Sequence, residues 1–439
     1  MQCDSRKRAL EGEGAPSAAA GAPPAMPAAH RLPPAAAGHE APERQLQLTD
    51  VIGVVAQSGY AREADACAGL CRATWRCIPG GLSAADADRV RSDHPLWRAI
   101  IDLEHGASDE TRLGWAARKG DLARVRELCD WRADVEAADA GGRTPLWAAS
   151  KAGDADTADA LLDAGANVHT ALDNGFEALM VASVNGHLDV VRVLLGARAS
   201  VRAATHEGAT ALIMACQEGH TAVARELIRA GAYVDATDFR GGTALISASE
   251  FGRDETVRVL LGFGADVEAA FTSASEDHGL TSLIAASQKG CLAAVRELLD
   301  HGADVNAAMC NGRTSMYVAS SGGHADVVRE LAGRGADAEA TDECGATPLI
   351  VASVRGHVDV VRALIGAGAK VDACYGVLGT ALLMASGVGQ VDAVRALLDA
   401  GADKRIEHMG ETARSVAGRA ETAAPGSRRA IRALLAAAP

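Results

Sequence analysis

The stretch TPLIVASVRGHVDVVRALIGAGAKVDA, residues 347–373, decides the fold of this chain. Thr347 can cap a helix that has Pro348 in its first turn, and Gly356 ends that short apolar helix. A second helix that faces the first is indicated by an apolar stripe at Val360, Val361, Leu364 and Ile365. Gly366 and Gly368 then supply the positive φ expected at a helix end, and the chain runs out as an extended finger. The unit is helix, turn, helix and finger.

The same unit recurs along most of the chain. Residues 177–203 read EALMVASVNGHLDVVRVLLGARASVRA, and ten copies begin at residues 111, 144, 177, 210, 243, 281, 314, 347, 380 and 412. Seven of the steps between them are 33 residues, one is 38 and one is 32. Neither helix is long enough to be stable alone, so each unit must stack on its neighbours. The period and the phrase resemble ankyrin repeats, which implies an all-α solenoid over residues 111–435.

Three regions follow from the changes in composition. Residues 1–45 are rich in alanine, proline and glycine and predict a disordered tail. Residues 46–106 show helical periodicity and predict a small helical module, and residues 107–439 form the repeat array with a C-terminal cap. The 38-residue step places extra residues at 270–279, as either a neutral bulge or a contact loop.

One position departs from the ankyrin phrase TPLH. Its histidine is replaced in eight copies by Trp147, Met180, Ile213, Ile246, Ile284, Tyr317, Ile350 and Leu383. We therefore expect burial there in place of a polar link.

The net charge of −14 disfavours nucleic acid and anionic membranes as partners. The ten cysteines are scattered, no signal peptide is recognised, and no run of 18 apolar residues occurs. We expect a soluble monomer in a reducing compartment, cytoplasmic or nuclear.

No residue pattern predicts catalysis, a cofactor or a metal. One histidine per repeat precedes the second helix, and we expect a capping role for His187, His220, His324 and His357. The spacing of Cys67, Cys71 and Cys77 lacks the paired CxxC motifs of a zinc site, and we expect these cysteines to be buried thiols. No phosphate loop, nucleophile elbow or metalloprotease motif is present.

An arginine recurs in the second helix, at Arg126, Arg192, Arg225, Arg258, Arg296, Arg329, Arg362 and Arg395, often with a glutamate beside it. This ribbon is either a solvated face with neighbouring opposite charges or a groove for an anionic partner.

The ankyrin resemblance implies that a protein partner lies against the finger tips and the exposed ends of the first helices. The corresponding residues are Lys151, Asn185, Glu218, Phe239, Arg240, Glu250, Phe251, Gln288, Lys289, Arg355 and Tyr375. Aromatic side chains are rare in this chain, so Phe239, Phe251 and Tyr375 are either contact anchors or residues packed between repeats. A non-catalytic interaction scaffold is the first functional hypothesis.

The module before the array resembles an F-box. The matching residues are Leu48, Val51, Val54, Val55, Leu70, Cys71, Trp75, Leu96 and Trp97, while Thr49 replaces a proline and the polar pair at 57–58 stands where apolar residues are expected. The resemblance implies docking to the linker subunit of a cullin ubiquitin ligase, with the array selecting the substrate. The alternative is an N-terminal cap whose apolar residues face Leu113 and Trp115.

Overall fold

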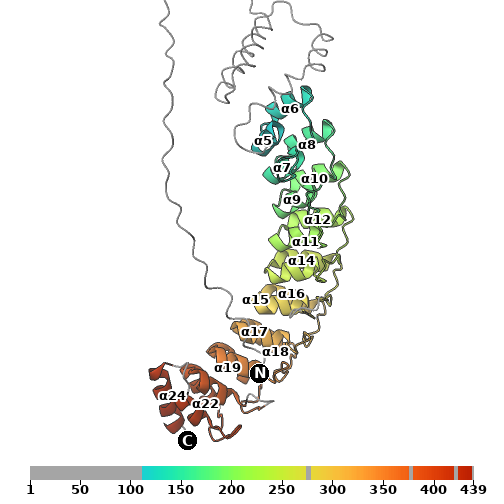
Figure 1. The fold of residues 1–439 in the computed structure, drawn as a ribbon. Coiled ribbons are helices and arrows are strands. Elements are labelled where there is room, and N and C mark those ends of the chain that lie inside the picture. The colour runs from blue at the N-terminus through green and yellow to red at the C-terminus, as the bar shows by residue number, and fades with distance from the viewer. Residues whose placement is uncertain (1–110, 273–277, 375–378, 420–423, 438–439) are drawn as a thin grey trace, which may run out of the picture. The chain divides into compact units, whose positions relative to one another are not determined.

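The structure is a computed structural model that describes residues 111–272, 278–374, 379–419 and 424–437. These residues form ten consecutive pairs of helices, stacked in chain order (Figure 1). The first helices are α5 (Arg112–Lys119), α7 (Pro145–Ala152), α9 (Ala178–Val184), α11 (Ala211–Glu218), α13 (Ala244–Glu250), α15 (Ser282–Lys289), α17 (Ser315–Gly322), α19 (Pro348–Arg355), α21 (Ala381–Val388) and α23 (Ala413–Arg419). The second helices are α6 (Leu122–Asp130), α8 (Ala155–Asp163), α10 (Leu188–Gly196), α12 (Thr221–Arg229), α14 (Asp254–Gly262), α16 (Leu292–Asp300), α18 (Ala325–Gly333), α20 (Val358–Gly366), α22 (Val391–Asp399) and α24 (Pro425–Ala437). The predicted all-α solenoid is confirmed.

A threonine begins most of the first helices. In α19 the Thr347 hydroxyl accepts a hydrogen bond of 3.3 Å from the backbone N–H of Ile350, and Pro348 stands in the first turn. Gly356 ends the helix with φ +78°, a conformation that other residues adopt only with strain. Glu177 begins α9 without a side-chain cap bond. Local chemistry therefore fixes the start and the end of each short helix.

The backbone after a second helix turns left-handed two residues beyond the helix end, as α20 shows. Gly366 is still the last residue of α20, and the left-handed conformation is found at Gly368, with φ +89°. The N–H groups of Gly368 and Ala369 reach back to the carbonyl oxygens of Ile365 and Leu364, each at 3.0 Å. The prediction of positive φ at Gly366 is wrong because the backbone reverses only where these bonds close.

The recurring histidines join neighbouring repeats. They stand at the N-cap positions of their helices, but none makes a side-chain cap bond, so the predicted capping role is wrong. Each ring instead places Nε2 3.0 to 3.1 Å from the backbone carbonyl oxygen of a residue 36 positions earlier. The pairs are His187 with Lys151, His220 with Val184, His324 with Gln288, and His357 with Ser321. Because a carbonyl oxygen only accepts, Nε2 carries the proton. Arg253 and Gln390 make the same link to residues 217 and 354.

The core lies within and between the layers. First helices pack on first helices, second on second, and the two helices of each repeat pack on each other. Alanines at the closest approaches are fully buried, among them Ala182, Ala215, Ala286 and Ala352. The residues that replace the TPLH histidine are buried as predicted, with two differences. Trp147 is only half-buried, and Tyr317 keeps a polar link, because its hydroxyl donates to Asp342 Oδ2 at 2.9 Å.

Two series of hydrogen bonds tie successive repeats outside the core. At the finger tips, the N–H of Phe239 donates to the carbonyl of Glu207, and that of Glu343 to Asn311, each at 2.9 Å. After the second helices, an acidic side chain of one repeat accepts from a backbone N–H of the next. Glu268 accepts in this way from the N–H of residue 304 at 2.7 Å, and Glu339 from that of Lys370 at 2.9 Å. The fingers and turns are therefore held in register by backbone groups.

The two irregular repeats keep the stacking intact. At the 38-residue step, Ala270 and Thr281 form an antiparallel bridge, and Phe271 between them is buried. Residues 273–277 lie outside the described part of the chain, so the predicted bulge or contact loop stays a prediction. The last helix, α24, is 13 residues long and buries Ile431 and Leu435, as a cap over the end of the array requires.

The predicted tail at 1–45 and the predicted module at 46–106 lie outside the described residues, as do the F-box-like positions. The same holds for Cys67, Cys71 and Cys77. Across the ranges that the structure covers, no helix has the length and apolar character needed to cross a membrane.

Candidate protein-binding face

The predicted contact residues at the ends of the first helices lie at the surface of consecutive repeats. Those that are exposed are Lys151, Asn185, Glu218, Phe251, Gln288, Lys289 and Arg355, and Glu250 is half-buried. Each lies at or just beyond the last turn of a helix whose preceding turns are buried in the array. We call these positions, together with the finger tips, the binding face. Tyr375 lies outside the described residues.

Two aromatic residues stand at the two ends of α13. Phe239, at the tip of the finger before this helix, is 77% exposed, and Phe251, just after the helix, is 48% exposed. Asp238 Oδ1 accepts bonds from the N–H groups of Arg240 at 2.9 Å and Gly242 at 2.7 Å, which closes the finger. Phe239 is thus presented to solvent on a backbone that is hydrogen-bonded on both sides.

The arginine ribbon is largely paired with carboxylates. Arg258 lies 2.8 Å from Glu297 of the next repeat and 3.1 Å from Glu255 of its own helix. Arg296 lies 2.8 Å from Glu330 in the same way. These partners match the interpretation as a solvated face with opposite charges, and such exposed pairs contribute little to stability.

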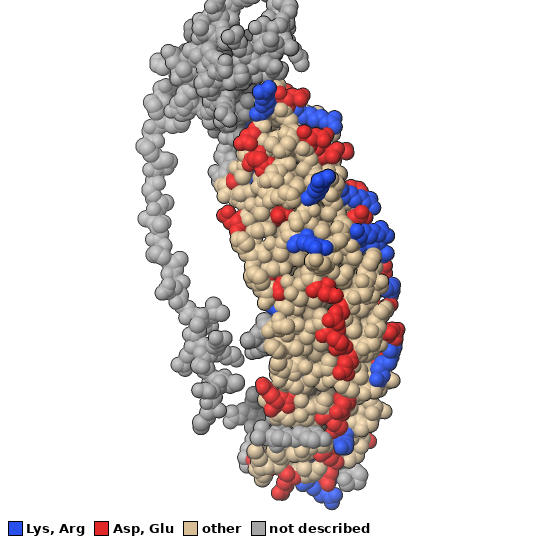
Figure 2. Space-filling model, turned by 90° about the vertical axis from the view of Figure 1, so that its right-hand side faces the viewer, with Lys and Arg blue, Asp and Glu red and all other residues tan. Residues whose placement is uncertain are grey.

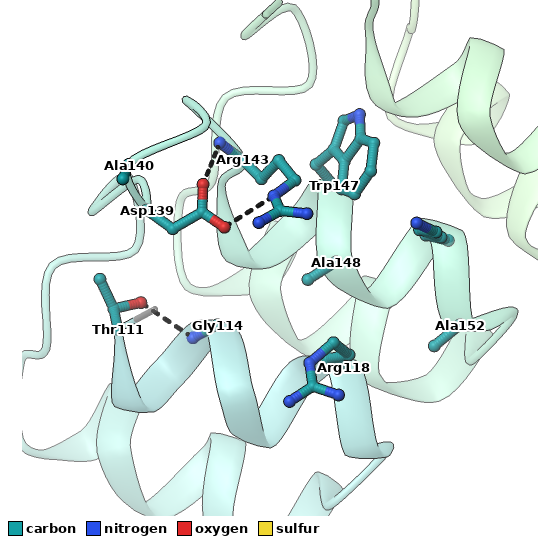
Figure 3. A pocket seen from close by; sticks show the side chains of 10 residues that line it. Thr111, Gly114, Arg118, Asp139, Ala140, Arg143, Trp147, Ala148 and Ala152 are labelled. Atoms are coloured by element: carbon teal, nitrogen blue, oxygen red, sulfur yellow. Dashed lines mark hydrogen bonds and ion pairs between the residues drawn. The ribbon is translucent and has the colours of Figure 1, made fainter. Parts of the chain in front are cut away.

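A groove lies between α5 and α7, at the first two repeats of the array (Figure 3). Its volume is about 660 Å³, and its lining includes Thr111, Arg118, Asp139, Arg143, Trp147 and Lys151. We call it the N-terminal groove. Of these, the sequence predicted Lys151 as a contact residue and Trp147 only as a buried one. A signal for Arg143 was present in the spacing, because Arg143, Trp147 and Lys151 follow one another at intervals of four, from just before the N-cap of α7 to its last turn.

The groove is positively charged around an indole. The guanidinium of Arg143 lies 5.9 Å and the ammonium of Lys151 lies 5.3 Å from the centre of the Trp147 ring, within the range of cation–π attraction. Asp139 is the carboxylate in the lining, and its Oδ2 accepts from Arg143 Nε at 2.7 Å (Figure 3). Burial raises the pKa of Asp139, but bonds from the N–H groups of Arg143 and Gly141 and from the guanidinium outweigh it, so the pKa lies below its usual value. Asp139 is therefore ionised and holds Arg143 in place.

The surroundings of the groove differ in charge from the rest of the chain. Residues 111–152 carry eight lysines and arginines against six acidic residues, whereas the whole chain has a net charge of −14. Farther along the array, acidic side chains gather in a row on one face (Figure 2). The groove is consequently a basic site on an acidic protein.

Other side chains that could carry chemistry are dispersed. Across the described ranges, no three His, Cys, Asp or Glu side chains gather in a geometry that could hold a metal ion. The six cysteines of these ranges are free thiols, of which Cys310, Cys344 and Cys374 are exposed. Cys216 is fully buried, and its burial raises the pKa of the thiol.

These features define a class of protein: an array of stacked helical repeats with exposed fingers and helix ends. The family model for ankyrin repeats matches residues 113–205, 179–271, 269–342 and 323–408, which together cover more than half of the chain. The chain belongs to the ankyrin-repeat family, and its repeats mark it as a protein-interaction scaffold.

Among solved structures, the chain is similar to the crystal structure of the human ASB11 ankyrin repeat domain. The two share 24% sequence identity with a TM-score of 0.46, and the match covers 52% of this chain and 99% of the other. No curated protein matches this sequence significantly.

Proposed function

We propose that this protein holds a partner protein against the binding face, with Phe239 and Phe251 as the central anchors. The observation that carries the proposal is the exposure of two large aromatic side chains at the two ends of one buried helix, α13. Aromatic residues are enriched among the residues that dominate binding energy at protein interfaces. The finger that carries Phe239 is already held by Asp238 and by the backbone bond to Glu207, so little conformational entropy is lost when a partner binds.

The test is affinity capture with the full chain, followed by titration with the purified partner. Phe239→Ser and Phe251→Ser should each weaken binding by about 1 to 2 kcal/mol, a factor of roughly 5 to 30 in Kd. Phe263→Ser is the matched control, because Phe263 is 41% exposed but follows a second helix, outside the binding face. Equal effects of all three substitutions would contradict the proposal.

A second candidate function is that of a substrate receptor in a cullin-type ubiquitin ligase. It is supported by the spacing of Leu70, Cys71 and Trp75 and of the pair Leu96 and Trp97, which resembles an F-box. Here the module at 46–106 would bind the linker subunit while the binding face selects the substrate. Recovery of the cullin and its linker by the wild-type chain, lost with the double substitution Val51→Asp and Val54→Asp, is the expected result. A folded wild-type chain that recovers neither would leave the scaffold function alone.

A further inference from the structure

The N-terminal groove differs from the rest of the binding face in its charge. Arg118, Arg143 and Lys151 supply three cations from α5, the first finger and α7, and Asp139 supplies one carboxylate. Both oxygens of Asp139 are already engaged, since Oδ1 accepts from the N–H groups of Gly141 and Arg143 and Oδ2 accepts from Arg143 Nε. Asp139 thus holds the guanidinium of Arg143 in place, and Lys151 adds a second cation beside the same indole.

Arg143 donates to Asp139 through only part of its hydrogen-bonding groups. Its bonds to Asp139 use the backbone nitrogen and Nε, and its side chain runs beneath Trp147 toward α5 (Figure 3). The terminal nitrogens Nη1 and Nη2 are one pair through which a guanidinium can hold a carboxylate by two parallel bonds. The arginine is therefore oriented before any ligand arrives, which lowers the cost of binding.

We infer that the N-terminal groove binds a short acidic segment of a partner protein, with clustered glutamate or aspartate side chains and an apolar side chain that packs on Trp147. This deepens the proposed function, on which it rests. Two cations beside an indole, Arg143 and Lys151, suit carboxylates next to an apolar group, and a volume of about 660 Å³ holds a few side chains. A long polyanion fits less well, because it would extend beyond the groove along a chain whose net charge is −14.

The groove is continuous with the binding face. Lys151 belongs to both, since it lies in the last turn of α7 at a position equivalent to the exposed ends of the other first helices. A partner anchored on Phe239 and Phe251 can thus place an acidic segment at the N-terminal end of the same surface. Charge complementarity at such an edge mainly sets the association rate and the choice of partner.

The probe is a fluorescein-labelled hexapeptide of four glutamates and two leucines, and the matched peptide carries glutamines in place of the glutamates. Anisotropy is measured with the full chain up to millimolar protein at low salt. Arg143→Gln and Lys151→Gln should each weaken binding of the acidic peptide about fivefold, as expected for the loss of one exposed ion pair. Lys370→Gln is the control, because it removes an exposed lysine that follows the second helix α20, outside the groove and the binding face.

A local signal is available from Trp147. Binding should change the tryptophan fluorescence of the wild type and of Trp115→Phe, and the change should be lost in Trp147→Phe. Circular dichroism and Tm establish that each variant is folded. Equal binding of the glutamine peptide, or an equal loss with Lys370→Gln, would overturn the inference. So would the absence of acidic-peptide binding to the full chain.

The two proposals fail separately. Phe239→Ser and Phe251→Ser should leave binding of the acidic hexapeptide unchanged, because neither residue lines the groove. If the groove variants bind the purified partner as well as the wild type while the two phenylalanine variants do not, the binding face stands and the acidic segment is excluded.

Discussion

Gly290→Ala tests the link that each histidine makes between repeats. Gly290 has φ +77°, and a Cβ there would lie 2.4 Å from Nδ1 of His324, whose Nε2 bonds to the Gln288 carbonyl at 3.1 Å. Gly264 is the matched control, because its φ is +80° but no heavy atom lies within 4 Å of the corresponding Cβ position. Both substitutions carry the strain of an alanine in the left-handed region, about 1 to 2 kcal/mol.

The two variants should differ by the displaced ring. In Gly290→Ala the imidazole must move and its bond to the carbonyl breaks, which costs about 1 kcal/mol more for the hydrogen bond and a similar amount for lost contacts. We therefore expect the free energy of unfolding to fall by about 2 to 4 kcal/mol in Gly290→Ala and by about 1 to 2 kcal/mol in Gly264→Ala. The assay is urea unfolding followed by circular dichroism. Amide exchange in α15 and α17 is measured in parallel, because a repeat array can unfold in parts.

A double-mutant cycle separates the clash from the backbone strain. In a His324→Ala background the ring is absent, so Gly290→Ala should cost no more than Gly264→Ala. If the two glycine variants lose the same free energy in the wild-type background, the histidine link contributes nothing and the reasoning is refuted.

Three further predictions concern buried groups. Tyr317→Phe removes the donor to the Asp342 carboxylate and should cost about 1 to 3 kcal/mol. Burial first, and then Asp342, raise the pKa of Tyr317 from 10.0 to about 12. The stabilisation by the Tyr317 hydroxyl is therefore present below pH 10 and is lost as the pH rises through 12. The urea midpoints of the wild type and the variant should converge over that pH range, and a constant difference between them would contradict the prediction. Ser353→Ala removes a fully buried hydroxyl that has no hydrogen-bond partner in the described part of the chain, so it should stabilise the protein by about 1 kcal/mol. Ser183→Ala, at the same repeat position, breaks a hydrogen bond of 2.7 Å to the Leu179 carbonyl and should not increase the stability. Equal shifts of the urea midpoint for these two serine variants would refute that reasoning. Cys216 should resist iodoacetamide in the folded protein while Cys310 is modified, as mapped by peptide mass spectrometry, and similar rates at the two thiols would show that the core opens readily.

The sequence was sufficient to predict the helices because each one is specified locally. Thr347 and Pro348 start α19 and Gly356 ends it, so the period of 33 residues carries the element order with it. The role of the histidines could not be predicted in the same way. His324 lies next to the helix it precedes, yet its partner is a carbonyl 36 residues earlier, and no local pattern reports such a contact.

The binding face was predicted in part. The exposed ends of the first helices follow from the repeat phase, as Lys289 and Arg355 illustrate. The groove requires two repeats to be placed together, since Arg118 comes from α5 and Trp147 from α7. The spacing of Arg143, Trp147 and Lys151 was a usable signal, but the period of the repeats drew attention to what recurs, and this cluster occurs once.

The central claim, that a partner protein is held on the finger tips and the ends of the first helices, is tested most directly by hydrogen–deuterium exchange of the purified complex. We expect slower exchange on binding at residues 238–242 and at the ends of α13 and α15, with exchange in α14 and α16 unchanged. Protection confined to the second helices, with the finger that carries Phe239 exchanging as in the free protein, would contradict it.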